Sequence, residues 1–311
     1  MTARSEGDQP ILSSSPEWWV IVNGARVSQA TLRHLADTCE KLDLKVRIKK
    51  TEFHGHAASL VQQALQLGLR NIAVAGGDGT LHSSVQGLMA WGGNSLDVRM
   101  GIIPMGTGND VARGLGLPRE LDASLRVLQG DSDRVVDTAH VRWDGGTATM
   151  INSLGLGFDV TVLSHLNRSW GKLSYLKAFV KAMGEVRPLD VLIRSAERDW
   201  TGNCMGLVLM LGSHTGGGMR PVAGSTLGSG QIHLSAIAPL GFVGILKRLP
   251  SLLGGGMRAD KAVTQWTSSH INFECSPEAP FHIDGEIKGS SPVDVTLKQR
   301  TLRFAVSREW R

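Results

Sequence analysis

Hydrophobic and polar residues alternate with two different periods through the first third of the chain. Short apolar or half-apolar runs typical of strands occur at residues 18–22, 45–50, 71–75 and 97–104. Residues 30–44 and 57–67 lie between these runs and carry apolar side chains at helical spacing. The alternation of strand and helix predicts a parallel sheet with crossover helices. Binding sites of such sheets lie at the carboxyl ends of the strands.

From about residue 140 the pattern changes to short alternating runs separated by turn signals. VRWDGGTATM contains Asp144-Gly145, a typical hairpin turn. LVLMLGS, QIHLSAIA, INFECS and HIDGEIKG are further strand candidates. We therefore predict an α/β protein of two domains, a parallel-sheet α/β domain at residues 17–140 and a mainly β domain at 141–294. The polar residues 1–16 are expected to form a disordered tail.

Two glycine-rich loops directly follow predicted strands. GGDGT at residues 76–80 precedes a helix, and its successive backbone N–H groups suit an anion such as a phosphate. MGTGND at residues 105–110 adds the Thr107 hydroxyl, and Asn109 or Asp110 is placed to cap the next helix. Because both loops lie at one edge of the sheet, they predict one shared phosphate site. The alternative for the first loop is a tight turn in which Asp78 caps the helix.

HIDGEIKG at residues 282–289 is the third candidate for a catalytic segment. Its Asp-Gly turn carries Glu286, which in an ordinary hairpin is simply an exposed acid. If the second domain folds over the sheet, Glu286 instead faces the glycine loops and can act as a general base. The common alternatives are absent: no P-loop sequence occurs, no G-x-G-x-x-G follows the first strand, and no G-x-S-x-G is found.

Composition and charge narrow the choice of partners. The net charge of +5 and the pI of about 9.3 favour anionic partners, but dispersed basic residues and a single tyrosine argue against nucleic acid. The odd number of distant cysteines, Cys39, Cys204 and Cys275, favours a reducing cytoplasm. No Cys/His cluster has zinc-site spacing. No apolar run reaches the ~18 residues needed to span a bilayer, so we expect a cytoplasmic protein that at most lies on a membrane.

Six motifs occur in a fixed order along the chain: GGDGT, IIPMGTGNDVARGLGLP, INSLGLGFD, WGKLSYL, GGGM and DGE. In this combination the chain resembles the diacylglycerol kinase catalytic-domain family, in its short bacterial lipid-kinase form, which is related to sphingosine and ceramide kinases. The similarity covers roughly residues 17–311. GGDGT alone is shared with NAD kinases, whereas GTGNDVAR and DGE separate the two groups.

The resemblance implies an ATP-binding α/β domain, a β-sandwich lipid-substrate domain that closes over it, and a last segment, residues 295–311, that returns to the first domain. It implies transfer of the ATP γ-phosphate to a lipid hydroxyl, with Mg²⁺ accompanying the nucleotide. The nucleotide-binding residues implied are Asn23, Thr51, Gly76, Gly77, Asp78, Gly79, Thr80, Gly106 and Thr107. The catalytic residues implied are Glu286 as general base, Asp78 and Asp137.

The sequence departs from the family pattern at three places. The usual N-P-x-x-G turn is shortened to NGAR at residues 23–26, and GGDGT is followed by Leu81, His82 and Ser83 instead of a hydrophobic residue, Asn and Glu. Relatives carry an aspartate that helps to bind a structural Mg²⁺ where this chain has Ser229. Because a neutral hydroxyl is a poor Mg²⁺ ligand, we predict that this structural metal site is lost or weakened.

Two segments are candidates for contact with a membrane. WGKLSYLKAFVKAM at residues 170–183 and GFVGILKRLPSLLGGGMR at 241–258 combine apolar helical faces with basic residues. The alternative is that each is an ordinary amphipathic helix packed on its domain.

The leading hypothesis is an ATP-dependent lipid kinase at a membrane surface. Two alternatives remain: a decayed module that binds nucleotide or lipid without catalysis, and an NAD kinase. The lipid could be a diacylglycerol, a sphingoid base, phosphatidylglycerol or an undecaprenyl-type alcohol, and the resemblance leaves a homodimer open.

Overall fold

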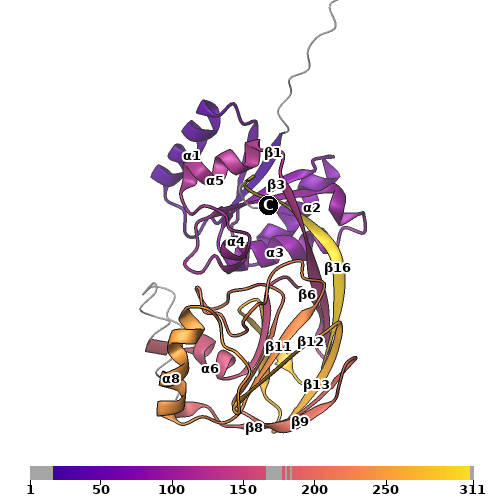
Figure 1. Ribbon diagram of the computed structural model, residues 1–311. Helices are drawn as coiled ribbons and strands as arrows, with labels where there is room; N and C mark the ends of the chain where they lie inside the picture. The colour runs from indigo at the N-terminus through magenta and orange to yellow at the C-terminus, as the bar shows by residue number, and fades with distance from the viewer. Residues whose placement is uncertain (1–16, 166–176, 179–180, 183, 309–311) are drawn as a thin grey trace, which may run out of the picture.

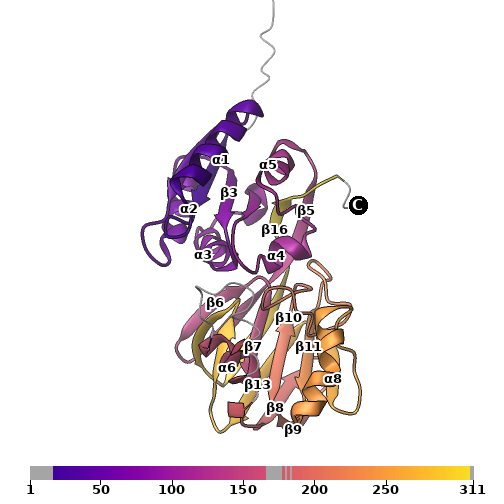
Figure 2. The same ribbon diagram turned by 90° about the vertical axis from the view of Figure 1, so that its left-hand side faces the viewer.

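The computed structural model describes residues 17–308 except 166–176, 179–180 and 183. The expected tail and most of the helical segment at 170–183 therefore lie outside the described residues. Two lobes are stacked in Figures 1 and 2, an α/β lobe above and a β lobe below. This arrangement confirms the predicted fold class.

The first domain is built on the predicted parallel sheet. Its strands are β1 (Trp18–Val22), β2 (Val46–Lys50), β3 (Asn71–Gly76) and β4 (Arg99–Pro104), in the order β2-β1-β3-β4. Its helices are α1 (Gln29–Lys41), α2 (His56–Gln66), α3 (Asp78–Met89), α4 (Asp110–Gly114) and α5 (Leu121–Gln129), with a 3-10 turn η1 (Ser95–Asp97). Parallel pairing brings the carboxyl ends of β1, β3 and β4 to one edge, where both glycine loops begin.

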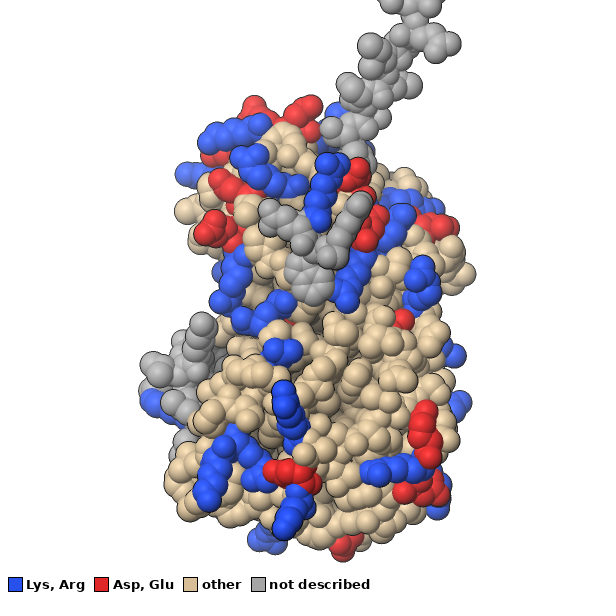
Figure 3. Space-filling model, viewed as in Figure 1, with Lys and Arg blue, Asp and Glu red and all other residues tan. Residues whose placement is uncertain are grey.

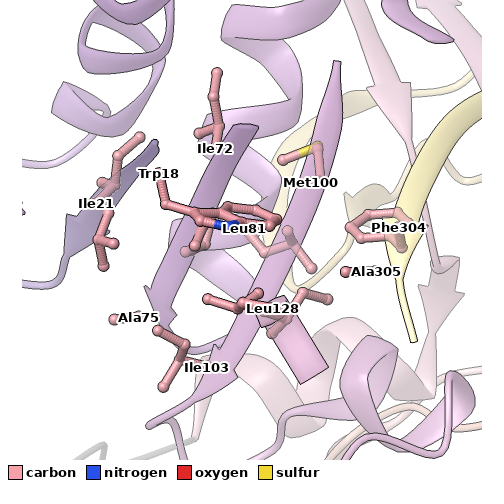
Figure 4. Packing of buried hydrophobic residues seen from close by; sticks show 14 of the residues in the cluster. Trp18, Ile21, Ile72, Ala75, Leu81, Met100, Ile103, Leu128, Phe304 and Ala305 are labelled. Carbon is pink, nitrogen blue, oxygen red and sulfur yellow. The ribbon is translucent and has the colours of Figure 1, made fainter. Parts of the chain in front are cut away.

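The core of this domain joins elements that are distant in sequence. Figure 4 shows Trp18 of β1 beside Leu81 of α3, with Met100 of β4 and Leu128 of α5 close by. Phe304, near the end of the chain, packs in the same core and is 1% exposed. All five residues of β1 are buried, as expected of a strand covered on both faces.

The second domain packs two sheets face to face. One sheet is antiparallel throughout and has the order β12-β11-β10-β7-β14-β15. Its strands are β7 (Ser153–Gly157), β10 (Gly206–Met210), β11 (Ile232–Ile237), β12 (Val263–Ser268), β14 (Pro280–Ile283) and β15 (Glu286–Ser290). The facing strands are β6 (Gly146–Met150), β8 (Leu189–Ser195), β9 (Trp200–Cys204) and β13 (His270–Ser276). Leu207 and Phe273 are both wholly buried in the core between the sheets.

Two short helices cover the outer side of the antiparallel sheet. They are α6 (Phe158–Ser164) and α8 (Phe242–Leu253), and Val162 and Ile245 pack there against Met205. In Figure 2, α8 lies at the edge of the lower lobe, beside β11.

Two long strands, β5 (Asp133–Trp143) and β16 (Val293–Ala305), run through both domains (Figure 1). They pair with each other along their length. β16 also pairs with β13 at its start and, in parallel, with β4 at Arg303 and Phe304. The cores of the two domains therefore separate within these strands, between Val136 and Ala139 on β5 and between Leu297 and Leu302 on β16.

The domain limits expected at residues 140 and 295 stay a prediction, and both positions fall inside these two long strands. The chain passes between the two cores within continuous strands, without a linker. The register of β16 against β5 is irregular between Lys298 and Leu302, and Arg300 there has a φ of 52°. The change of domain coincides with this irregularity.

Candidate active site

A cleft of about 430 Å³ lies where the carboxyl ends of β1, β3 and β4 face the turn between β14 and β15. Most of the site residues that the sequence singled out line this cleft: Asn23, Thr51, Gly77, Asp78, Gly79, Thr80, Gly106, Thr107 and Glu286. Gly76 lies just behind the lining, where a Cβ would come within 2.9 Å of the Thr80 side chain. The structure thus brings the first glycine loop, the second glycine loop and Glu286 to one cavity.

The two glycine loops touch backbone to backbone. A Cβ added at Gly106 would lie 2.4 Å from the Gly77 Cα, so only glycine fits there. Asn109 closes the second loop, because its side chain accepts from the Gly106 N–H at 2.9 Å and donates to the Gly106 carbonyl at 2.7 Å. The two loops lie at one site because their backbones pack directly against each other.

Asp78 joins the loops through hydrogen bonds. Its Oδ1 accepts from the backbone N–H groups of Asp110 at 2.8 Å and Val111 at 3.3 Å. The carboxylate of the first loop thus caps the helix that follows the second loop. This differs from both sequence-based expectations, in which Asp78 caps its own helix or Asn109 or Asp110 caps the next one.

Asn23 is hydrogen-bonded to the first glycine loop, and Thr51 to the turn that follows β1. Asn23 donates from Nδ2 to the Thr80 hydroxyl at 3.0 Å, and the Gly24 N–H donates to the Thr51 hydroxyl at 3.1 Å. The shortened NGAR turn therefore still places Asn23 and Thr51 at the cleft.

A buried pair of carboxylates lies beneath the loops. Burial and the neighbouring Asp78 raise the pKa of Asp110 to about 7, and burial also raises the pKa of Asp78. Asp110 Oδ2 accepts from the Gly217 N–H at 2.8 Å, while its Oδ1 is buried without a hydrogen-bond partner among the described residues. Two close carboxylates with an unsatisfied oxygen fit a divalent cation.

No cluster of three or more His, Cys, Asp or Glu residues in the described part of the chain is arranged to hold a metal ion by protein ligands alone. Mg²⁺ commonly binds only one or two carboxylates, together with substrate phosphates.

Glu286 faces the loops from the second domain. Its Oε2 accepts from Lys288 Nζ at 2.8 Å, and its Oε1 lies 3.4 Å from His54 Nε2. Burial tends to raise the pKa of Glu286, but the Lys288 hydrogen bond and the charges of His82, Lys288 and His54 outweigh burial and lower this pKa. Glu286 is therefore ionised at neutral pH and able to accept a proton.

Asp137, the third implied catalytic residue, is not at the cleft. Its carboxylate is 3% exposed and accepts from the Gly230 and Arg300 N–H groups, both at 2.8 Å. Arg300 lies in the irregular part of β16, where the ladder with β5 is interrupted. Asp137 therefore accepts the hydrogen bond of an N–H group that has no partner strand there. Support of the active site by Asp137 stays a prediction, and the contacts that the structure gives this carboxylate are structural.

The loop around Ser229 offers a poor set of metal ligands. The Ser229 hydroxyl donates to the Gln231 carbonyl at 3.2 Å, and Gln299 Nε2 donates to the Gly230 carbonyl at 3.1 Å. The nearby Asp137 carboxylate already accepts two N–H groups. These hydrogen bonds give no support for a structural Mg²⁺ at the loop, and the loss of that site stays a prediction.

Sequence reasoning missed four groups around the cleft as functional residues: Asp110, Asp284, Lys288 and His54. Asp284 lay in the quoted HIDGEIKG motif but was interpreted only as a turn residue. It has a φ of 50° and precedes Gly285 at 85°, the backbone of a two-residue hairpin. Its side chain is 2% exposed and accepts hydrogen bonds from three consecutive backbone N–H groups, those of residues 151–153.

Comparison with known proteins places this fold and cleft in a class of kinases. Residues 17–141 match the diacylglycerol kinase catalytic domain, and residues 152–306 match the YegS C-terminal NAD kinase beta sandwich-like domain. The chain belongs to the diacylglycerol kinase catalytic-domain family, in the lipid kinase branch that combines these two domains.

Relatives and solved structures cover nearly the whole chain. A probable lipid kinase YegS-like of Klebsiella pneumoniae (strain 342) is 26% identical over 296 residues, covering 94% of this chain and 96% of the relative. A probable lipid kinase YegS of Shigella flexneri is 25% identical over 298 residues, with the same coverage. A crystal structure of a diacylglycerol kinase from Bacillus anthracis str. Sterne superposes with a TM-score of 0.75 at 18% identity over 95% of this chain and 98% of that one. The last similarity concerns the fold alone.

Proposed function

We propose that this lipid kinase family member transfers the γ-phosphate of ATP to the hydroxyl of a membrane lipid. The observation that carries the proposal is the meeting of two glycine loops and Glu286 at a single cleft of about 430 Å³. Phosphoryl transfer requires mainly positioning and charge neutralisation, which backbone N–H groups and a metal supply.

Each part of the cleft has a role in this reaction. Asn23, Thr51, Thr107 and the glycine loops bind and orient the nucleotide, with their N–H groups directed at its phosphates. Asp78 and Asp110 would hold Mg²⁺, which supplies positive charge beside the β- and γ-phosphates when it is bound. Glu286 accepts the proton of the lipid hydroxyl as that oxygen attacks phosphorus.

A series of cavities supports a lipid as the acceptor. The cleft shares Asp78, Leu163, Asp284 and Gly285 with a neighbouring cavity of about 80 Å³. That cavity shares Asp159, Val162, Thr215 and Met219 with a third cavity of about 80 Å³, which lies beneath α8. Apolar side chains such as Ile245, Leu249 and Leu252 of α8 line the third cavity. A lipid with its hydroxyl at Glu286 and an acyl chain toward α8 suits this change from polar to apolar surroundings.

The outer face of α8 supports docking on a membrane surface. Phe242, Val243, Leu246 and Leu253 are 58%, 62%, 44% and 61% exposed. α8 is therefore apolar both toward the protein and toward solvent, although such a helix is normally buried. The exposed Lys247 lies on the same helix and suits anionic headgroups.

Other observations fit peripheral attachment at the cytoplasmic face. In the described part of the chain, no helix is long and apolar enough to cross a membrane. The three cysteines are buried and free, which favours a reducing compartment. Figure 3 shows Lys and Arg spread over both lobes on one face and interspersed with acidic residues.

The docking surface is testable with vesicles of phosphatidylglycerol and phosphatidylcholine. The double variant Phe242→Ser, Leu246→Ser is expected to lower vesicle binding at least tenfold in a sedimentation assay, because full burial of each such side chain contributes about 1.5–3 kcal/mol. Leu67→Ser is the matched control, since Leu67 is 57% exposed at the end of α2 in the other domain. Equal binding by the double variant and the wild type would rule out α8 as the docking element.

The proposed function is tested by transfer of labelled γ-phosphate from ATP·Mg²⁺ to a panel of lipid alcohols in mixed micelles. A labelled lipid is the expected product and names the substrate class. ATP binding without any labelled lipid would instead favour a module that binds nucleotide without catalysis. Labelled NADP from NAD would contradict a lipid acceptor.

A further inference from the structure

His82 of α3 lies buried directly behind Glu286, and the reaction described so far does not use it. The side chain is 2% exposed, and its Nδ1 lies 2.8 Å from Asp284 Oδ2. Its Nε2 lies 3.9 Å from Glu286 Oε2 and has no hydrogen-bond partner among the residues that the structure describes. A buried imidazole nitrogen directed at a carboxylate requires an explanation.

Asp284 determines which imidazole nitrogen carries the proton. Its Oδ1 accepts from the N–H groups of Asn152 and Ser153, both at 2.9 Å, and its Oδ2 accepts from Ile151 N–H at 3.0 Å. These partners can only donate, so the carboxylate acts as an acceptor toward His82 as well. Nδ1 is therefore protonated, and in the neutral ring the lone pair of Nε2 faces Glu286.

The local backbone places these groups in a row. The two-residue turn between β14 and β15 positions Asp284 and Glu286 two residues apart, and the His82 ring lies between their carboxylates. The ring comes from α3 in the other domain, four residues after Asp78, the first residue of that helix.

Other titratable groups surround this row without interrupting it. Lys288 of β15 and His54, which precedes α2, contact the carboxylate of Glu286. Asp78 begins α3, and His282 of β14 accepts from the Gly285 N–H through Nδ1 at 3.3 Å while its Nε2 lies 3.3 Å from Asp159. Among the described residues, the carboxylates within 4 Å of the His82 ring nitrogens are those of Asp284 and Glu286.

We infer that His82 receives the substrate proton from Glu286 and thereby returns the base to its ionised form. This inference rests on the proposed kinase reaction. As the lipid oxygen attacks the γ-phosphorus, its O–H bond breaks, an O–H bond forms on Glu286, and the bond from phosphorus to ADP breaks. The proton then passes from Glu286 Oε2 to His82 Nε2. The resulting imidazolium lies against the Asp284 carboxylate. After the product has left, its proton returns to water by way of Glu286, which lines the cleft.

The direction of the second transfer follows from the surroundings of Glu286. Lys288 and the histidines favour its ionised form, so protonated Glu286 is a stronger acid than an ordinary carboxylic acid. An ordinary imidazole has a pKa of about 6.5 and is the better base of the two. The distance of 3.9 Å between Glu286 Oε2 and His82 Nε2 has to shorten for this transfer, as catalytic hydrogen bonds commonly do when substrate binds. His82 acts through Glu286 and is a positioning residue.

The variant His82→Asn tests whether His82 takes up a proton or only makes a structural contact with Asp284. The Asn amide nitrogen can donate to Asp284 in place of Nδ1, but the side chain has no counterpart of Nε2. We expect kcat to fall by roughly tenfold, less than the about 10²- to 10⁴-fold typical of losing a base, with the KM for ATP unchanged. The pH dependence of kcat should also differ between the wild type and the variant, because only the wild type has an imidazole beside Glu286 that can take up a proton.

Gln86→Ala is the matched control, because it removes a contact between the two domains that has no part in the proton transfer. Gln86 lies one helical turn after His82 and exchanges two hydrogen bonds with the Thr149 backbone, at 2.7 and 2.9 Å. Its loss should lower Tm but leave the pH profile of kcat unchanged. If His82→Asn shows a wild-type kcat and pH profile with phosphorylated lipid as product, the proton transfer to His82 is overturned while the kinase function stands.

The interaction between His82 and Glu286 can also be tested in the absence of substrate. In ¹⁵N-histidine NMR spectra of the full chain, Glu286→Gln should change the Nε2 chemical shift of His82, because an amide replaces the carboxylate 3.9 Å from that nitrogen. An unchanged Nε2 chemical shift would overturn the inference. If the chemical shift changes but no lipid alcohol is phosphorylated, the proposed function fails, and the proton transfer fails with it.

Discussion

Replacement of Glu286 by glutamine is expected to lower kcat for lipid phosphorylation by about 10²- to 10⁴-fold, the usual effect of losing a general base. Glutamine has the same size, and its carbonyl oxygen can accept the Lys288 hydrogen bond that Glu286 accepts at 2.8 Å. It cannot take up a proton from the lipid hydroxyl. The affinity for ATP should stay within a few-fold, because the glycine loops are untouched. Steady-state kinetics and calorimetric ATP titration measure the two quantities.

The control for this variant is Glu278→Gln. Glu278 is exposed just before β14, where it accepts from the Ser290 hydroxyl at 3.1 Å, and it does not line the cleft. It should leave kcat unchanged. A Glu286→Gln enzyme as fast as the Glu278→Gln enzyme would show that another group removes the proton.

Replacement of Asp78 by asparagine is expected to lower kcat/KM for ATP·Mg²⁺ by about 10²- to 10³-fold. The charge stabilisation by a catalytic metal is worth several kcal/mol, and each 1.36 kcal/mol is a factor of ten in rate. The amide oxygen can still accept from the Asp110 and Val111 N–H groups, so the cap of α4 is kept. Steady-state kinetics at varied Mg²⁺ concentration measure the effect.

Thermal unfolding distinguishes a lost metal ligand from a damaged fold. The charge of Asp78 raises the pKa of Asp110, so removing that charge relieves repulsion and Tm should not fall at pH 8. Asp144→Asn is a control at an exposed carboxylate in the turn between β5 and β6. An Asp78→Asn protein that is less stable and equally active per folded molecule would contradict the assignment.

The strands and glycine loops of the first domain could be predicted because each depends on local sequence. Apolar runs such as residues 71–75 identify buried strands, and glycines at their ends identify close backbone approach. Parallel order then places both loops at one edge. Gly77 and Gly106 are in contact there, although the sequence around each glycine does not predict how close the two backbones come.

The buried polar contacts could not be predicted in this way, because their partners are far apart in sequence. His82 and Asp284 are separated by 202 positions, and neither has a local pattern that identifies the other. His82 stood out only as a departure from the family, and Asp284 only as a turn residue. The contacts of Asp137 could not be predicted for a related reason. It accepts from the Arg300 N–H next to a register irregularity in β16, which sequence periodicity does not reveal.

The passage of β5 and β16 through both cores makes the two lobes one cooperative unit. Val136 and Leu302 pack in the upper core, while Ala139 and Leu297, on the same two strands, pack in the lower one. Melting either core would remove two strands from the other. Opening and closing of the cleft therefore has to come from twisting of a continuous sheet, and neither lobe can be excised by cutting at a linker.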